Sequence, residues 1–241
     1  MIHSYPSVFA LGHKALAELL LDPVLVEEKI DGSFFSWRVN PDGAMEARSQ
    51  GKEIYVDAPE DMFIPAVESA RSLPSHPGWI YRAEFLAKPK QTSLTYNRIP
   101  AQHLIIFDIE VGLEDYLPWE EKAEEAARLG LEVVPRLYWG MVSGPNLIHE
   151  LLSTPSILGG QTVEGIVCKN YIRYGIDKKA LMGKYVSEDF KEVHVREWKL
   201  SNPTSRDIIQ ELIFRYKTHA RWMKAVQHLT EEGRLEGSPR D

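Results

Sequence analysis

Short β-branched and aromatic runs, separated by turn-forming residues, make up most of the chain. The runs at residues 24–26 and 34–39 predict two strands. Asn40-Pro41-Asp42-Gly43 follows the second run and is typical of a hairpin connection. Further strands are predicted for residues 79–86, 104–111, 131–139 and 162–168, and for an extended stretch that includes residues 184–186.

Apolar residues at helical spacing predict helices at residues 12–22, 59–72, 119–129 and 146–152. Since the predicted strands outnumber the helices and do not alternate regularly with them, the pattern predicts an α+β fold with largely antiparallel sheets and flanking helices. After Lys199 the spacing becomes helical again. We therefore expect a main domain over residues 1–200 and a short helical C-terminal extension over residues 201–241, which is too small to be an independent domain.

The composition is typical of a globular protein without a membrane-spanning segment. The 241 residues are 44% hydrophobic and 26% charged, and no apolar run approaches the roughly 18 residues that cross a bilayer. The N-terminus carries no secretory signal. Cys168 is the single cysteine, which excludes an internal disulfide framework and a cysteine-based zinc site. These features predict a cytoplasmic protein that does not bind membranes.

The net charge of −7 disfavours indiscriminate binding to nucleic acid, but the charge is unevenly distributed. Residues 1–168 carry 13 basic against 24 acidic side chains, whereas residues 169–224 carry 13 against 7. A cationic segment on an acidic body is expected of a protein that meets a polyanion at one place. The same lysines and arginines could equally form a solvated face.

Lys29-Ile30-Asp31-Gly32 places a lysine between a predicted buried strand and a tight turn. An ordinary lysine amine is protonated near neutral pH and is a poor nucleophile. In a partly desolvated pocket beside other cations or a metal, the amine can lose its proton and attack an electrophile. Alone, the tetrapeptide is more often an ordinary junction between strand and turn.

Further islands of charged and aromatic residues follow Lys29 in order. These are Ala47-Arg48-Ser49, Tyr81-Arg82-Ala83-Glu84-Phe85, Ile105-Ile106-Phe107-Asp108-Ile109, Val163-Glu164-Gly165-Ile166-Val167-Cys168-Lys169 and Gly183-Lys184-Tyr185-Val186. The ordered set resembles the nucleotidyltransferase motifs shared by ATP-dependent RNA ligases, DNA ligases and mRNA capping enzymes. Residues 94–100, 130–135 and 163–171 are most similar to phage-type and bacterial RNA ligases. The resemblance extends over residues 20–200.

The resemblance implies an ATP-grasp-like nucleotidyltransferase (adenylyltransferase) domain and an RNA ligase reaction in three steps. Lys29 would attack the α-phosphorus of ATP, giving lysyl-AMP and pyrophosphate. AMP would then pass to a 5′-phosphate end, and a 3′-hydroxyl would finally attack that end and expel AMP. Mg²⁺ or Mn²⁺ is implied as the cofactor that offsets the charge of the triphosphate. The implied partners are RNA ends, including those of a nicked duplex or an RNA–DNA hybrid, bound by a monomer in the cytoplasm of a bacterium or a phage-infected host.

The resemblance also implies roles for individual residues. These are Lys29 as the nucleophile, Lys169 and Lys184 on the α-phosphate, Arg48 on the ribose or a phosphate, Glu84 on the ribose hydroxyls, Phe107 stacked on adenine, Glu164 at the metal, and Glu28, Ile30, Asp31 and Gly32 around the nucleotide. Asp31 cannot help to deprotonate Lys29, because a nearby anion favours the charged amine. Lys169, Lys184 and the metal are therefore expected to supply the opposing positive field.

Several interpretations stay open at this point. Relatives often carry Lys-x-Lys in the last motif, whereas Val186 stands at the second position here; either Lys184 acts alone, or Lys191 or Lys199 replaces the missing lysine. Out of context, Phe107 also fits a core position. Two further structural alternatives are a cross-strand pair of Glu84 with Arg82 or Arg48 and an inert buried thiol at Cys168.

The identity of the nucleic acid is the last alternative. DNA ligases and capping enzymes add a strand-rich OB-fold domain of about 100 residues after the nucleotidyltransferase domain. The segment after Lys199 is shorter and helically patterned, which favours an RNA ligase. A minimal ligase that seals DNA nicks, and an idle nucleotide- or RNA-binding protein with the same fold, are the competing hypotheses.

Overall fold

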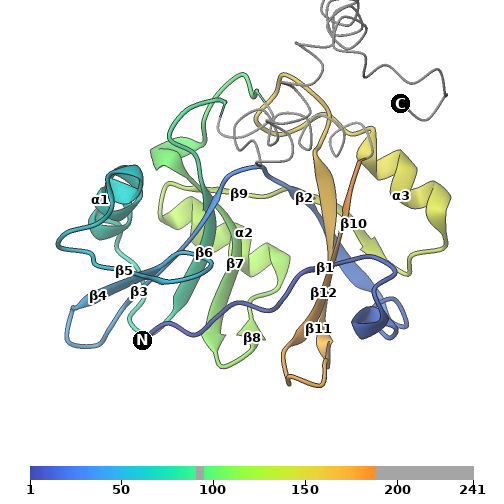
Figure 1. Cartoon of the computed structure of the whole chain (residues 1–241), viewed down its shortest axis with the longest axis horizontal. Coiled ribbons are helices and arrows are strands. Elements are labelled where there is room, and N and C mark those ends of the chain that lie inside the picture. The colour runs from blue at the N-terminus through green and yellow to red at the C-terminus, as the bar shows by residue number, and fades with distance from the viewer. Residues whose placement is uncertain (91–94, 188–241) are drawn as a thin grey trace, which may run out of the picture. The chain divides into compact units, whose positions relative to one another are not determined.

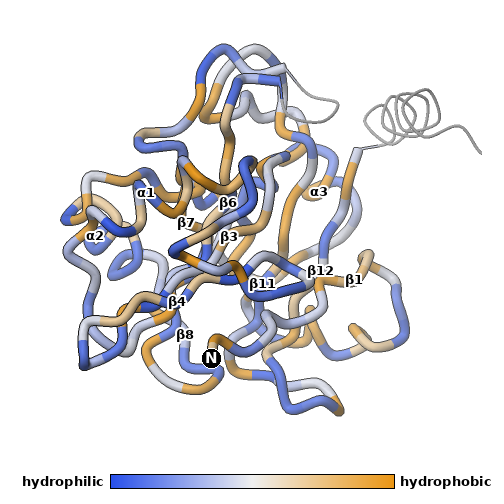
Figure 2. The backbone as a smooth tube through the Cα atoms, turned by 60° about the vertical axis from the view of Figure 1, so that its left-hand side comes forward, coloured by the Kyte–Doolittle hydropathy of each residue, from blue (hydrophilic) through white to orange (hydrophobic). Residues whose placement is uncertain are grey.

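The computed structural model describes residues 1–90 and 95–187, and within them the predicted α+β architecture is confirmed (Figure 1). Two sheets carry the strands, and both are largely antiparallel. Hydrophobic stretches concentrate on central strands such as β6 and β7, and hydrophilic ones on outer loops (Figure 2). The predicted boundary at residue 200, the helical extension, Lys191 and Lys199 lie outside the described residues.

Sheet A brings together strands from both ends of the described chain. In spatial order it contains β1 (Phe9–Ala10), β12 (Ala180–Val186), β11 (Gly165–Tyr174), β2 (Val24–Lys29) and β10 (Arg136–Gly140). One face is apolar and is covered by η1 (Lys14–Leu16) and α3 (Pro145–Leu152). Val24 and Val26 of β2 pack there against Ile148 and Leu151. Because side chains alternate along a strand, Glu27 and Lys29 of β2 face the other way, whereas Glu28 lies on the same side as Val26.

Sheet B faces the charged side of sheet A across a pocket that is described below. Its order is β5 (Glu53–Ile54), β4 (Met45–Arg48), β3 (Ser33–Val39), β6 (Ile80–Phe85), β7 (Leu104–Gly112) and β8 (Asp115–Tyr116), with β9 (Glu132–Val133) parallel to β7. Its apolar face packs against α1 (Ile64–Ser72) and α2 (Trp119–Arg128) in the larger core. Phe35, Trp37 and Tyr81 are fully buried in that core. Two short 3₁₀ turns, η2 (Asp61–Phe63) and η3 (Ala101–His103), complete the elements.

Two sequence predictions of regular structure are wrong. The helix expected over residues 12–22 is reduced to the single turn η1, since Gly12 adopts a φ of +93° and Leu16 and Leu19 reach the core without a longer helix. The single strand expected over residues 131–139 is two strands, β9 and β10. Pro135 separates them because it lacks an N–H for a ladder, and the chain crosses there from sheet B to sheet A.

Smaller shifts affect other boundaries. The segment 59–72 begins with the turn η2 before α1, and β11 starts at Gly165 rather than at residue 162 and continues to Tyr174. Cys168 is fully buried, and burial raises the pKa of its thiol to about 12, as expected of an inert thiol. In the described part of the chain, no helix is both long and apolar enough to cross a membrane.

Candidate active site

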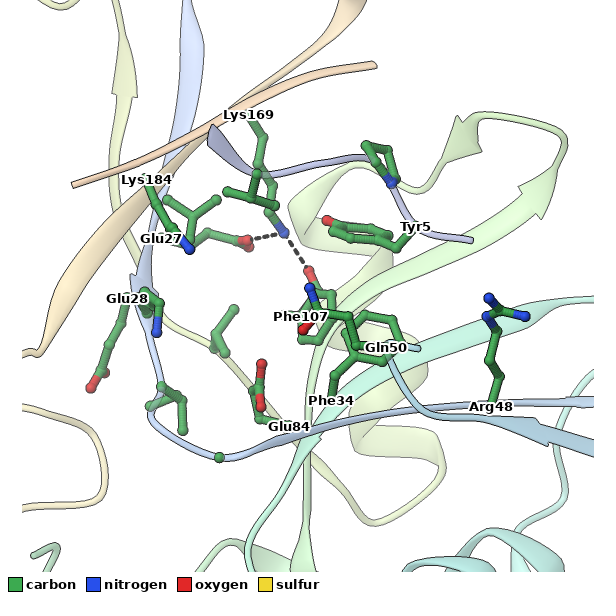
Figure 3. A pocket seen from close by; sticks show the side chains of 17 residues that line it. Tyr5, Glu27, Glu28, Phe34, Arg48, Gln50, Glu84, Phe107, Lys169 and Lys184 are labelled. Atoms are coloured by element: carbon green, nitrogen blue, oxygen red, sulfur yellow. Dashed lines mark hydrogen bonds and ion pairs between the residues drawn. The ribbon is translucent and has the colours of Figure 1, made fainter. Parts of the chain in front are cut away.

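A pocket of about 250 Å³ lies between the charged face of sheet A and sheet B (Figure 3). Nine of the residues predicted for the site line it: Glu28, Lys29, Ile30, Gly32, Arg48, Glu84, Phe107, Lys169 and Lys184. The other two lie next to it. Asp31 belongs to the turn after Lys29, and Glu164 is bonded to Lys29 directly. The structure thus brings together residues that are up to 156 positions apart in the chain.

Strand register explains why three lysines share one face of sheet A. Gly165 lies opposite Lys29 on β2, and Lys169 lies opposite Leu25. Val167, between them on β11, lies opposite Lys184 of β12. Since directly opposed residues project to the same side of a sheet, the period of two carries all three ammonium groups to the pocket side.

Lys29 is held by an ion pair at the base of the pocket. Its Nζ donates to Glu164 Oε1 at 2.7 Å and to Oε2 at 2.8 Å. Burial disfavours the ammonium form, but the carboxylates of Glu164, Glu84 and Asp31 outweigh burial and raise the pKa of Lys29. In this arrangement the amine is protonated, so a nucleophilic role requires a compensating positive charge.

Glu84 faces the same space from β6. Burial raises the pKa of Glu84 to about 8, with Glu164 and Asp31 acting in the same direction and Lys29 opposing them. The side chain is therefore largely a neutral acid near pH 7, able to donate a hydrogen bond. Arg82 donates to Glu110 at 2.9 Å instead of pairing with Glu84, so the alternative of an Arg82–Glu84 pair is wrong.

Gly32 makes the turn after Lys29 compatible with Glu84. A Cβ at position 32 would lie 3.0 Å from Glu84 Cβ, Glu84 Oε2 and Leu86 Cδ1. The close approach therefore favours a glycine there, because a larger residue would have to displace the Glu84 or Leu86 side chain. Tyr96 fixes the same turn, because its hydroxyl oxygen accepts a hydrogen bond from the backbone N–H of Asp31 at 2.8 Å.

Phe107 presents an aromatic ring from an irregular point of β7. The pairing of β6 with β7 shifts between Arg82 and Ala83, which leaves Phe107 in a bulge. The ring is half-buried and lies 5.7 Å from the ring of Phe34. A ring with one accessible side in a pocket can stack on a planar base.

Lys169 lies in a buried cluster of opposite charges beneath Phe107. Its Nζ is 2.6 Å from Glu27 Oε2 and 3.0 Å from Asp108 Oδ2, and it donates to the Phe107 carbonyl at 2.7 Å. Lys122 of α2 donates to Glu27 Oε1 at 2.5 Å and to the same carbonyl at 2.6 Å. Two ammonium groups thus neutralise two carboxylates, as burial of charge requires.

Lys184 and Arg48 lie toward opposite sides of the pocket (Figure 3). Burial raises the pKa of Glu164, and the positive charges of Lys29 and Lys184 partly oppose that shift. Val186 follows two residues later on the same side of β12, so this strand offers one lysine at the pocket. Arg48 carries a buried Nε that has no hydrogen-bond partner among residues 1–90 and 95–187. An unpartnered guanidinium nitrogen fits an anionic ligand.

One family model matches most of this chain. The family model described as RNA ligase matches residues 22–186, which include every residue predicted for the site. The chain belongs to the RNA ligase family. A comparison with curated proteins gives no match.

Solved ligase structures share the family's fold with this chain. A Naegleria gruberi RNA ligase is 18% identical with a TM-score of 0.57, covering 80% of this chain and 58% of its own. An archaeal ATP-dependent RNA ligase is 18% identical with a TM-score of 0.58, covering 95% and 63%. A protein provisionally described as an ATP-dependent DNA ligase from Aquifex aeolicus is 22% identical with a TM-score of 0.56, covering 96% and 63%.

Two further facts bear on these comparisons. The chain spans about three fifths of the length of the solved structures that it matches. One structure of the Naegleria gruberi RNA ligase contains ATP and Mn. At these identities the likeness establishes the nucleotidyltransferase fold of the family.

The acidic residues around Lys29 fit a divalent cation. The acidic side chains of Glu164 and Asp31, and that of Glu84 when it is ionised, act on its single ammonium group. Carboxylate oxygens are the ligands preferred by Mg²⁺ and Mn²⁺, and an excess of negative charge favours such an ion.

Some pocket residues were missed by the sequence prediction. Tyr5, Pro6, Val8, Phe34 and Gln50 line the pocket, and Lys122 supports it from below. The first three lie in a segment without a motif. Lys122 had a detectable signal, because it occupies the buried stripe of α2 together with Ala126. A lysine in such a stripe indicates a buried partner.

Proposed function

We propose that this chain is an ATP-dependent RNA ligase that joins 5′-phosphate and 3′-hydroxyl ends through lysyl-AMP. The observation that carries the proposal is the Lys29 amine at the base of a pocket that also offers an aromatic ring, acids and further cations. Membership in the RNA ligase family supports it. The proposed division of the chain is an adenylyltransferase domain over residues 1–200 and a C-terminal extension over residues 201–241.

In the first step the Lys29 Nζ attacks the α-phosphorus of ATP, and the bond from that phosphorus to the pyrophosphate oxygen breaks. The attacking amine must be neutral, so the ammonium form that Glu164 favours first releases a proton to solvent. Glu164 is the proposed ligand of Mg²⁺ or Mn²⁺, and Glu84 lies near it. When bound, the metal ion would offset the negative charges of the triphosphate and of the carboxylates. The ATP and Mn in the Naegleria gruberi ligase support both ligands.

The nucleoside is held by groups on sheet B in this proposal. Phe107 stacks on the adenine ring, and base stacking contributes about 1–3 kcal/mol. Glu84, largely protonated near neutral pH, bonds the ribose hydroxyls. Glu28 and Ile30 place backbone groups beside the base, and Gly32 and Asp31 shape the turn that receives the phosphates.

The phosphates are held by the three remaining cationic side chains. Lys184 acts on the α-phosphate from β12, and Arg48 acts on the ribose or a phosphate from β4. Lys169 is the other proposed ligand of the α-phosphate. To bind a phosphate oxygen, its ammonium group must leave its ion pairs with Glu27 and Asp108. Lys122 remains close to the carboxylates of Glu27 and Asp108 when Lys169 leaves, so both carboxylates keep one positively charged partner.

A joining assay tests the proposed function. End-labelled RNA with a 5′-phosphate is incubated with ATP and MnCl₂, and joining is scored as protection of the label from phosphatase. Single strands, nicked duplexes and a looped tRNA-like break are compared, each with RNA or DNA at the 3′-hydroxyl. Joining that requires RNA supports the RNA ligase. Joining that accepts all-DNA nicks would support the minimal DNA ligase, to which the Aquifex aeolicus structure lends weight.

The idle-binder hypothesis makes a different prediction from either ligase. A protein that only binds ATP retains labelled nucleotide at equilibrium but releases all of it in denaturant. A ligase retains AMP through denaturation because the phosphoramidate is covalent. Cytoplasmic location and a monomeric state belong to the proposal and are tested separately, by fractionation of cells and by light scattering.

A further inference from the structure

The N-terminal segment, residues 1–11, lies outside the span of the family match yet helps to form the pocket. Tyr5, Pro6 and Val8 all line it. The end of the segment is fixed to sheet A, where β1 runs parallel to β12 and Ala10 lies opposite Lys184. The backbone N–H of Leu11 donates to the Lys184 carbonyl at 2.8 Å. The segment is therefore joined to the strand that carries a proposed phosphate ligand.

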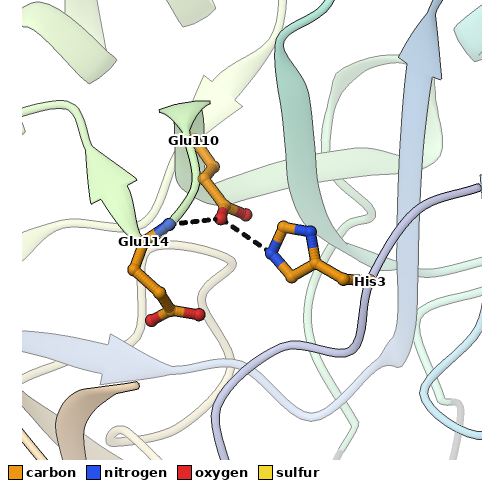
Figure 4. Close-up of side chains that lie close together, drawn as sticks. All are labelled: His3, Glu110 and Glu114. Carbon is orange, nitrogen blue, oxygen red and sulfur yellow. Dashed lines mark hydrogen bonds and ion pairs between the residues drawn. The ribbon is translucent and has the colours of Figure 1, made fainter. Parts of the chain in front are cut away.

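The beginning of the segment is fixed to sheet B by His3. Its Nε2 lies 2.7 Å from Glu110 Oε1, which also accepts from the backbone N–H of Glu114 (Figure 4). Arg82 NH1 donates to the His3 carbonyl at 3.2 Å. Because the Arg82 guanidinium also lies 3.4 Å from His3 Nε2 and bonds Glu110, its positive charge opposes a metal at this cluster. The cluster functions as an anchor.

Tyr5 lies between these two anchors and contacts the centre of the pocket. Its hydroxyl donates to Asp108 Oδ2, the same oxygen that Lys169 contacts. Its ring centre is 5.3 Å from that of Phe107 with an interplanar angle of 71°, and 5.9 Å from that of Phe34. Edge-on contacts of this kind are favourable and directional. The ring therefore forms a wall against Phe107 and limits its rotation.

We propose that Tyr5 is a positioning residue of the nucleotide pocket, whose ring holds Phe107 in the orientation that stacks on the nucleobase. This inference rests on the proposed function, since it takes the base of ATP as the ligand of Phe107. The N-terminal segment then belongs to the substrate-binding structure and is not an appendage. Loss of the ring should weaken binding of ATP and leave the chemistry at Lys29 intact.

The test compares Tyr5→Ala, Tyr5→Leu and Tyr5→Phe with the unaltered protein and with Tyr55→Ala. Tyr55 is 82% exposed and does not line the pocket, so it is the matched control. The rate of covalent AMP transfer to the protein is measured against ATP concentration, and thermal unfolding is recorded for each variant. Tyr5→Ala is expected to raise KM for ATP about fivefold to tenfold and to change kcat less than twofold. Tyr5→Phe, which keeps the ring, is expected to restore KM to within twofold of the original.

Two results would overturn the inference. One is a KM for Tyr5→Ala equal to that of Tyr55→Ala, and the other is a defect in Tyr5→Phe as large as that in Tyr5→Ala. If Tyr5→Ala does not fold, Tyr5→Leu keeps apolar volume without a flat ring and has the same expected KM. If the unaltered protein transfers no AMP, the proposed function fails, while titration calorimetry of ATP with the same variants still tests Tyr5, with Kd in place of KM.

Discussion

The Lys29 amine and the Glu164 carboxylate form a two-point contact, at 2.7 and 2.8 Å, in the floor of the pocket. The residue best placed to be a nucleophile is thus stabilised in its non-nucleophilic, protonated form. Glu164 is also the residue proposed to bind the divalent cation. One carboxylate can therefore favour the ammonium in the free protein and bind the cation when ATP arrives.

Replacing Glu164 by Gln is expected to lower the pKa of Lys29, because the charge that raises it is removed. The pH dependence of acetylation at Lys29, read by peptide mass spectrometry, should move to lower pH. The exposed Lys14 in the same digest is the internal reference. The same variant should transfer AMP more than about tenfold more slowly, because a proposed metal ligand is lost. An unchanged Lys29 profile would show that Glu164 does not control the amine.

Glu84→Gln should change how stability depends on pH. The pKa of Glu84 is about 8 in the folded protein and about 4.3 when unfolded, so the folded state binds the extra proton over that interval. As the pH rises from about 4.3 to about 8, the free energy of unfolding of the unaltered protein should therefore fall, relative to that of the variant. The expected slope is up to about 1.4 kcal/mol per pH unit. Urea unfolding at pH 5, 6.5 and 8 measures it. Parallel pH profiles would contradict a raised pKa.

Phe107→Ala should raise KM for ATP by about 5- to 150-fold, which corresponds to loss of one stacking contact of about 1–3 kcal/mol. Phe107→Tyr keeps an aromatic face and is the matched control. Initial rates of AMP transfer over a range of ATP concentrations provide the measurement. If both variants bind ATP as the unaltered protein does, the base lies elsewhere and Phe107 is a core residue.

Gly165→Ala should destabilise the fold by about 1–3 kcal/mol. A Cβ at this position would lie 2.3 Å from the Tyr185 carbonyl oxygen and 3.0 Å from Val186 Cα, so β12 would have to move away from β11. Gly51→Ala is the control, because its Cβ would meet open space. Chemical unfolding of both variants decides the matter, and equal midpoints would mean that the strands adjust without strain.

Local patterns in the sequence predicted most of the strands because each strand carries its own alternation. The hairpin at Asn40 and the helix α2 also depend on neighbours in the chain, and both were predicted correctly. The motif residues met in one pocket because the strands that carry them are adjacent in the two sheets. The same period of two places Lys29 and Glu27 on one face of β2.

The features that were missed depend on contacts between distant segments. Tyr5 acquires a role through Phe107 and Asp108, the latter 103 positions away, and Lys122 pairs with Glu27, 95 positions away. No local periodicity encodes such pairings. The passage of the chain from sheet B to sheet A at Pro135 was missed for a related reason. The apolar run over residues 131–139 does not show that its first half joins one sheet and its second half the other.

The most direct test of the account is the covalent state of Lys29 after exposure to ATP. Protein incubated with ATP and MnCl₂ is digested, and the peptide that contains Lys29 is examined by mass spectrometry, with EDTA-treated protein, Lys29→Ala and Lys14→Ala as controls. The account predicts AMP on Lys29 in the unaltered protein and in Lys14→Ala, and no AMP with EDTA or in Lys29→Ala. AMP on another lysine, or an unmodified Lys29 in protein shown to bind ATP and Mn²⁺, would contradict it.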